Sequence, residues 1–389
     1  FVLILLAFEL SIFGTFITRS GVISSVHSFA MSNVGPLFVI FLVISLLFGI
    51  FWIVYRSSEL HSELRMTSFF SREASFLLNN LLFVAICFAI FWGTVFPILS
   101  EWVTGEKITV AAPFFNKVNL PLGLALLVLT GICPLIAWRK ASVKNFRKNF
   151  LTPLAAGALT GLGVVALGIH DLIPLMFFSA CGFVTMTVVN EFYKGARARR
   201  AIRKTGFAIA LRDLTLMNKQ RYGGFIIHVG AVLVFAGIIG SSFFSQEEFF
   251  TVREGEQFTL GDYTLSFEGL TERKDPEKEV VTASLAVFKG GERISDLYPE
   301  KHYHYKSEQP MTEIKIRSTP QEDLYVVLSG WDEQGQVTFR IFINPMVQVI
   351  WIGIGIMVLA GIFVMFPNSK PGPTVAVRSP RKEVRDEAA

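Results

Sequence analysis

Long runs of apolar residues, separated by short polar connections, occupy most of this chain. About eight runs are near the length that lets an α-helix cross a bilayer. They lie at about 1–16, 35–55, 75–98, 119–138, 150–169, 172–191, 222–244 and 345–366. The pattern therefore predicts a polytopic α-helical membrane protein. The first run has no leading Met and no charged region before it, so we expect a truncated span rather than a signal peptide.

The segment between the last two runs, residues 245–344, changes to a two-residue period. Alternating stretches such as Phe258–Phe267 and Val281–Phe288 are followed by turn signals, including the pair Gly290 and Gly291. Alternation of this kind predicts half-buried strands joined by hairpins. We expect a small all-β domain inserted before the last span, and a disordered tail at 367–389, where prolines and mixed charges accumulate.

Composition and charge support a membrane protein and orient it. The chain is 52% hydrophobic, contains 38 Phe, and has a formal net charge of +5. Its basic residues gather in alternate connections, at 56–72, 139–148 and 194–221, and in the tail. By the positive-inside rule these connections and the C-terminus are cytoplasmic, which places the β-domain in the periplasm. The basic charge thus reports topology, and nothing indicates a nucleic-acid partner.

One histidine, His228, lies inside the apolar run at 222–244. An ionisable side chain within a span is expensive and therefore a candidate functional group. At helical spacing its face holds Gly224, Phe225, Ala231, Val232 and Phe235. The small residues near it leave room either for a close-packed helix or for a flat macrocycle. A hydrogen bond between helices is the alternative role for the ring.

The connection at 17–34 carries a second candidate histidine, His27. Projected as a helix, its serines fall in one arc and its apolar residues in the other, a pattern typical of a helix lying in the membrane interface. His27 points with the apolar residues, and Arg19 is a nearby cation suited to a carboxylate. An ordinary hydrogen-bonding role for His27 stays open. In the β-domain, His302 and His304 alternate on one strand face and could bind a metal, although no third ligand is evident.

Several motifs, in order along almost the whole chain, resemble the CcmF/NrfE-like family of cytochrome c haem lyases from the bacterial System I pathway. They are Gly14–Ala30, Ser71–Phe83, Gly93–Pro97, Pro113–Asn116, Arg221–His228 and a closing run that starts at Ile343. The resemblance is to the C-terminal part of the family. It implies a helical haem-handling domain at 1–244, a periplasmic β-domain at 245–344, a last span at 345–366 and a cytoplasmic tail.

The resemblance also implies roles for the two histidines. His27 is the counterpart of a loop histidine that ligates haem delivered by the chaperone CcmE, and His228 that of an axial ligand of a stable intramembrane haem b. Arg19 is then a candidate contact for a haem propionate. The partner histidines and the tryptophan-rich segment of the family lie upstream, so we expect this chain to hold half of each ligand set, as a truncated record or as one product of a split gene.

The implied activity is that of a haem lyase, which promotes thioether attachment of haem to the CxxCH motifs of apocytochrome c in the bacterial inner membrane. We expect the intramembrane haem to reduce the transient substrate haem, with CcmH/CcmI-type subunits handling the apocytochrome and lipid surrounding the spans. Two alternatives stay open: a membrane transporter or export channel, and a non-catalytic scaffold of a haem-assembly complex.

Overall fold

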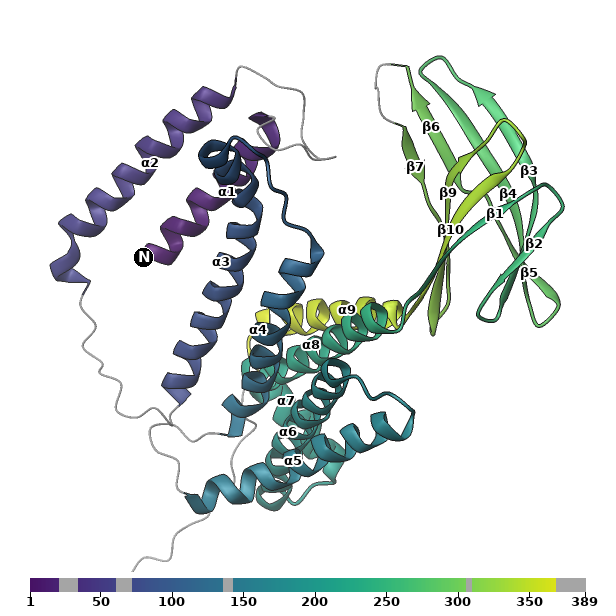
Figure 1. The fold of residues 1–389 in the computed structure, drawn as a ribbon. Coiled ribbons are helices and arrows are strands. Elements are labelled where there is room, and N and C mark those ends of the chain that lie inside the picture. Colours follow the sequence, from purple (N-terminus) through teal and green to yellow (C-terminus); the bar gives the residue numbers. More distant parts are fainter. Residues whose placement is uncertain (21–33, 61–71, 136–142, 306–309, 369–389) are drawn as a thin grey trace, which may run out of the picture. The chain divides into compact units, whose positions relative to one another are not determined.

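The structure is a computed structural model, and it describes residues 1–20, 34–60, 72–135, 143–305 and 310–368 (Figure 1). The chain divides into two compact units. The first comprises residues 1–129 and 136–146, and the second comprises 130–135 and 147–389.

The first unit contains long apolar helices that make few but close contacts. They are α1 (Val2–Ser20), α2 (Gly35–Tyr55), α3 (Arg72–Thr104) and most of α4 (Ala112–Ile132), with a short 3₁₀ turn η1 at Ser57–Glu59. Phe13 of α1 lies 5.9 Å from Phe91 of α3 between ring centroids. A Cβ added at Gly93 would come within 2.6 Å of the Phe115 ring, so that glycine lets α4 approach α3. Most remaining apolar side chains of this unit are exposed, as expected of surfaces that face lipid.

The second unit contains the other helices and all of the strands. Its helices are η2 (Cys133–Leu135), α5 (Val143–Ala166), α6 (Leu172–Arg203), α7 (Phe207–Met217), α8 (Lys219–Phe243) and α9 (Val347–Met365). Among the described residues of the whole chain, eight helices are long and apolar enough to span a membrane. This confirms the predicted class of polytopic helical membrane protein.

Helix α6 and the short helix α7 differ from the pattern of spans and connections. Helix α6 continues to Arg203, well past the predicted end of its span at 191, and α7 forms within the basic stretch that follows. Hydropathy marks only the part of a helix that lies in hydrocarbon. The sequence after Glu191 is rich in Ala, Arg and Lys, which favour helix whatever their hydropathy.

Helices α8 and α9 lie side by side and antiparallel, and glycines let their backbones touch (Figure 1). A Cβ added at Gly230 would lie 2.7 Å from the carbonyl oxygen of Gly353, and one at Gly237 would lie 2.9 Å from the nitrogen of Ile350. Gly223 of the same helix packs against the side chain of Val364. Because the three α8 glycines recur every seven residues, they occupy one face, and this face is closed by α9.

A β-sandwich lies between α8 and α9 in the sequence. One sheet has the order β1-β10-β9-β8, and the other has the order β2-β3-β4-β6-β7 with β5 also paired to β4. The strands are β1 (Gln246–Val252), β2 (Gln257–Leu260), β3 (Tyr263–Lys274), β4 (Lys278–Lys289), β5 (Glu292–Leu297), β6 (Glu300–His304), β7 (Met311–Glu313), β8 (Lys315–Ser318), β9 (Glu322–Trp331) and β10 (Val337–Pro345). Leu265, Leu285, Leu328 and Ile341 are fully buried between the sheets. The predicted small all-β domain is therefore present.

The sandwich is joined to the helix pair by short, hydrogen-bonded connections. The Met346 N–H donates to the Gln321 carbonyl at 2.9 Å, and the Gln348 side-chain amide donates to Asp323 at 3.3 Å. Met346 itself adopts a left-handed backbone conformation (φ 61°) between β10 and α9, and its side chain packs on Gly240 of α8. The two ends of the sandwich are thus held where α8 ends and α9 begins.

The glycine contact predicts a clear difference between two substitutions. Gly230→Ala should lower the stability of the protein by about 1–3 kcal/mol, because its methyl group meets backbone atoms that cannot move aside. Gly355→Ala on α9 is the matched control, since a Cβ there meets nothing within 4 Å. Thermal unfolding in detergent measures both. Equal unfolding temperatures for the two variants would contradict the described packing.

Candidate functional site

His228 lies near the middle of α8 with part of its ring buried. Among the side chains that the structure describes, none forms a hydrogen bond with its buried Nδ1 atom. Its nearest ring neighbour is Phe225, at 6.4 Å between centroids and tilted by 60°. Gly224 lies one turn before His228 on the same face, and a Cβ added there would meet nothing within 4 Å. The face of α8 that carries His228 is therefore open one turn before the ring, at Gly224.

One face of α8 packs against α9, and another face carries His228. Gly230 lies two positions after His228, about 200° around the helix, and packs against α9. The sequence left open whether the small residues near His228 make room for a helix or for a flat ligand. Gly223, Gly230 and Gly237 let α9 pack closely, whereas Gly224 leaves space on the face that carries His228.

Helix α6 fixes α8 through contacts that flank His228 along the helix. Phe177 stacks on Phe235 at 6.1 Å, and the thiol of Cys181 lies 3.8 Å from the carbonyl oxygen of Val232. Toward the start of α8, Arg221 forms an ion pair with Glu191 at 2.9 Å. These contacts hold the backbone on both sides of the imidazole, which is what a rigid axial ligand requires.

The other two predicted site residues are not part of the described surroundings of His228. His27 lies outside the described residues. Arg19 is an exposed residue in the last turn of α1, in the first unit. The roles predicted for His27 and Arg19 therefore stay predictions.

One ionisable residue that the sequence argument missed is Glu9 of α1. Only 8% of its surface is exposed, and no described residue forms a hydrogen bond with its buried Oε1 atom. It shares a helix face with Leu5, which packs on Gly49, and with Phe13. The signal that singled out His228, an ionisable side chain within an apolar run, would have found Glu9 as well.

Within the described residues, the histidines of the sandwich are not grouped into a metal site. The ring of His302 is engaged at both nitrogens, with Nε2 at 3.0 Å from Glu300 and Nδ1 at 3.3 Å from Lys278. In the described part of the chain, no three His, Cys, Asp or Glu side chains are grouped so that they could hold a metal. His302 is 8% exposed, and its contacts make it part of a polar network on the outer side of β4 and β6.

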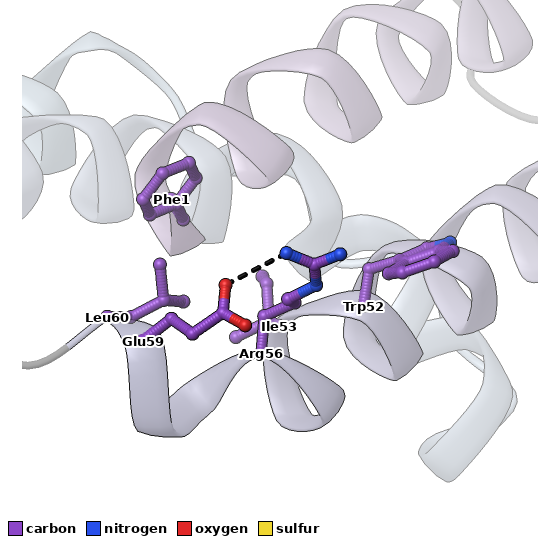
Figure 2. A pocket seen from close by; sticks show the side chains of 6 residues that line it. All are labelled: Phe1, Trp52, Ile53, Arg56, Glu59 and Leu60. Carbon is purple, nitrogen blue, oxygen red and sulfur yellow. Dashed lines mark hydrogen bonds and ion pairs between the residues drawn. The ribbon is translucent and has the colours of Figure 1, made fainter.

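A cavity of about 380 Å³ lies in the first unit, where α2 ends (Figure 2). Its polar groups satisfy one another, because Arg56 pairs with Glu59 at 2.9 Å and lies over the Trp52 ring. Phe1, Ile53 and Leu60 supply its apolar lining. Among the described side chains that line this cavity, the acid and the base are thus already paired with each other.

The Glu300–His302 contact predicts a pH-dependent contribution to stability. The hydrogen bond from His302 lowers the pKa of the Glu300 carboxyl, so the folded state favours the carboxylate. That contribution is present above the usual carboxyl pKa and is lost as the pH falls through the lowered one. Glu300→Gln should therefore unfold at a lower temperature than the wild type at pH 7, by the equivalent of about 1 kcal/mol or less. The difference should shrink as the pH falls from 7 to 3, whereas the exposed control Glu292→Gln should match the wild type at both. A gap of the same size at pH 3 would contradict this coupling.

Comparisons with known proteins agree with the architecture. Residues 243–345 match the family model described as the CcmF C-terminal β-sandwich. The cytochrome c-type biogenesis protein CcmF of Haemophilus influenzae is 28% identical over 365 residues, which is 94% of this chain and 55% of that protein. CcmF of Pseudomonas aeruginosa is 30% identical over 358 residues, which is 91% of this chain and 53% of that protein. A solved structure, cytochrome c heme lyase CcmF, shares the fold with a TM-score of 0.69 at 24% identity, over 93% of this chain and 54% of that one.

In the described part of the chain, eight candidate spans and a β-sandwich inserted before the last of them define a polytopic membrane protein with a compact domain outside the helices. Nearly all of the chain is therefore similar to CcmF proteins of cytochrome c-type biogenesis, and its sandwich matches the family model of the CcmF C-terminal β-sandwich. It spans about half the length of the curated relatives that it matches.

Proposed function

We propose that this chain acts in cytochrome c maturation, as a component of a haem lyase in the bacterial inner membrane. Relatives named as cytochrome c-type biogenesis proteins over nearly all of the chain support this assignment. In the proposed reaction, the cysteine thiols of a CxxCH segment add across the vinyl groups of haem and form thioethers. A periplasmic chaperone of the CcmE type supplies the haem, and CcmH/CcmI-type subunits present the apocytochrome.

The observation that carries the proposal is the imidazole of His228, whose buried Nδ1 atom has no hydrogen-bond partner among the described residues, on a helix face that is open one turn earlier at Gly224. A buried nitrogen without a partner is destabilising unless a ligand satisfies it, and imidazole is a common axial ligand of haem iron. The residues present therefore fit a haem b, which when bound would supply one-electron redox chemistry. Phe225 and the apolar face of α8 exclude water from the imidazole, and the contacts with α6 and α9 keep its helix from rotating.

The distribution of basic residues supports the proposed side of the membrane for the other parts of the chain. Residues 1–244 form the helical haem-handling domain, residues 245–344 the periplasmic sandwich, residues 345–366 the last span and residues 367–389 a cytoplasmic tail. In this arrangement His27 ligates the transient substrate haem at the outer surface, and Arg19 contacts a propionate. Positioning of haem and thiols at that surface, rather than acid–base chemistry, would then accelerate attachment.

Two histidine substitutions separate the two proposed haems. Protein purified from its own membranes should show a b-type band in the reduced-minus-oxidised spectrum, and His228→Ala should lose it. His27→Ala should keep that band and should instead lose attached haem in the cell's c-type cytochromes, measured by haem staining. His170→Ala, at an exposed turn, is the control for both measurements.

Three outcomes would contradict the proposal in different ways. A b-type band retained in His228→Ala would remove the ligand role of that residue. Normal cytochrome c content in His27→Ala would remove the role of the outer loop. A wild-type protein without bound haem would favour the transporter alternative.

A further inference from the structure

The end of α6 and the start of α7 carry a concentration of positive charge that the proposed haem chemistry does not use. From Glu191 to Arg221 the sequence contains nine basic and two acidic residues. Both acids are already engaged: Glu191 with Lys194 and Arg221, and Asp213 with Arg203 and Arg212. The excess positive charge of this region is therefore not balanced within the described chain.

Three of these basic residues form a continuous stripe on α6. Arg197 and Arg200 are three residues apart and lie along one face of the helix, and Lys204 follows four residues later as the C-cap residue, directly after the last turn. All three are exposed, and within the described part of the chain no carboxylate lies within ion-pairing distance of any of them. The stripe is thus available to an anion from outside the chain.

Aromatic and apolar side chains adjoin the stripe. Tyr193 lies one turn before Arg197 on the same face and packs on Phe207 of α7, with ring centroids 6.0 Å apart. Tyr193 is 53% exposed and Phe207 is 40% exposed, and Ile209 beside them is 47% exposed. Tyrosine next to apolar and basic side chains is typical of the depth at which lipid headgroups meet acyl chains.

The length of α6 places this cluster at that depth. No charged residue occurs between Leu172 and Asn190, which gives a run of about 28 Å at 1.5 Å per residue, close to the hydrocarbon thickness of a bilayer. The charged part of α6 then emerges from the hydrocarbon. Helix α7 stays at this level because Ala210 and Leu214 are buried, and Leu214 packs in one cluster with Ala196 of α6 and Tyr222 of α8.

We infer that Arg197, Arg200 and Lys204, with the Tyr193–Phe207 pair, form a binding site for an anionic phospholipid. The three cations receive the headgroup phosphate, and the exposed aromatic and aliphatic side chains contact the upper acyl chains. The site does not require haem. A bound lipid would hold together the junction of α6, α7 and α8, and α8 begins about two turns before His228.

The test is lipid titration of the full chain in detergent, followed by native mass spectrometry. Phosphatidylglycerol should bind the wild type much more tightly than phosphatidylcholine does. The triple variant Arg197→Gln/Arg200→Gln/Lys204→Gln should weaken phosphatidylglycerol binding about a hundredfold, as expected for the loss of three cations near an anionic headgroup. The matched control Arg253→Gln/Arg273→Gln/Lys274→Gln removes the same charge from exposed positions of the sandwich and should leave binding unchanged.

Three results would overturn the inference. They are equal affinity in the two triple variants, equal affinity of the wild type for the two lipids, and displacement of the lipid by millimolar inorganic phosphate, which would indicate a site for free anions. Thermal unfolding without added lipid verifies that the triple variant is folded. If it is not, Arg200→Gln alone should still lower the affinity several-fold, and unchanged binding by that variant would equally overturn the inference.

Discussion

The close approach of α8 and α9 is the contact on which the rest of the second unit depends. Between helices in a membrane, lipid is as apolar as Leu, so association relies on packing and on short backbone distances rather than on the hydrophobic effect. Gly230 and Gly353 allow that approach, because a Cβ on either would meet the carbonyl oxygen of the other at 2.7 Å. The contact also sets the spacing of the two chain ends that enter and leave the sandwich.

The same contact determines what the other face of α8 can do. With α9 against its glycines, the helix cannot rotate, and His228 is held away from α9 beside the space at Gly224. A polar ring in a span is tolerated when it has a partner, and the described residues leave one buried nitrogen of His228 without any. The packing of Gly223, Gly230 and Gly237 against α9 thus fixes which way the face with His228 points. In the first unit, Glu9 likewise has a buried oxygen without a hydrogen-bond partner among the described residues.

Much of this architecture is predictable from the sequence, because the long apolar runs of the spans differ strongly from the two-residue alternation of the strands. Apolar runs predicted the spans, and alternation together with the Gly290–Gly291 pair, whose φ values are 62° and 85°, predicted the sandwich and one of its hairpins. Helix α7 and the last turns of α6 were not predicted, because a hydropathy pattern detects only the helical segments that are long and apolar enough to cross a membrane. The partners of the sandwich histidines were not predictable either. Glu300 lies two residues before His302, but Lys278 reaches it only because β4 pairs with β6.

For the candidate site, the sequence singled out His228, but it did not show that the neighbouring residues Gly223 and Gly224 lie in different surroundings. Gly223 and Gly224 are adjacent in the sequence, and only three-dimensional packing shows that the first touches α9 and the second faces open space. The role of His27, by contrast, rests entirely on the family resemblance.

The orientation of α8 against α9 can be measured directly by disulfide formation. In a background with Cys87, Cys133 and Cys181 replaced by Ala, the pair Gly223→Cys/Val364→Cys should cross-link on mild oxidation, because Val364 is the nearest side chain to a Cβ at Gly223. The pair Gly224→Cys/Val364→Cys, shifted by one residue and about 100° around the helix, should stay reduced. Cross-linking at 224 in preference to 223, or to the same extent at both, would contradict the orientation that places His228 on its open face.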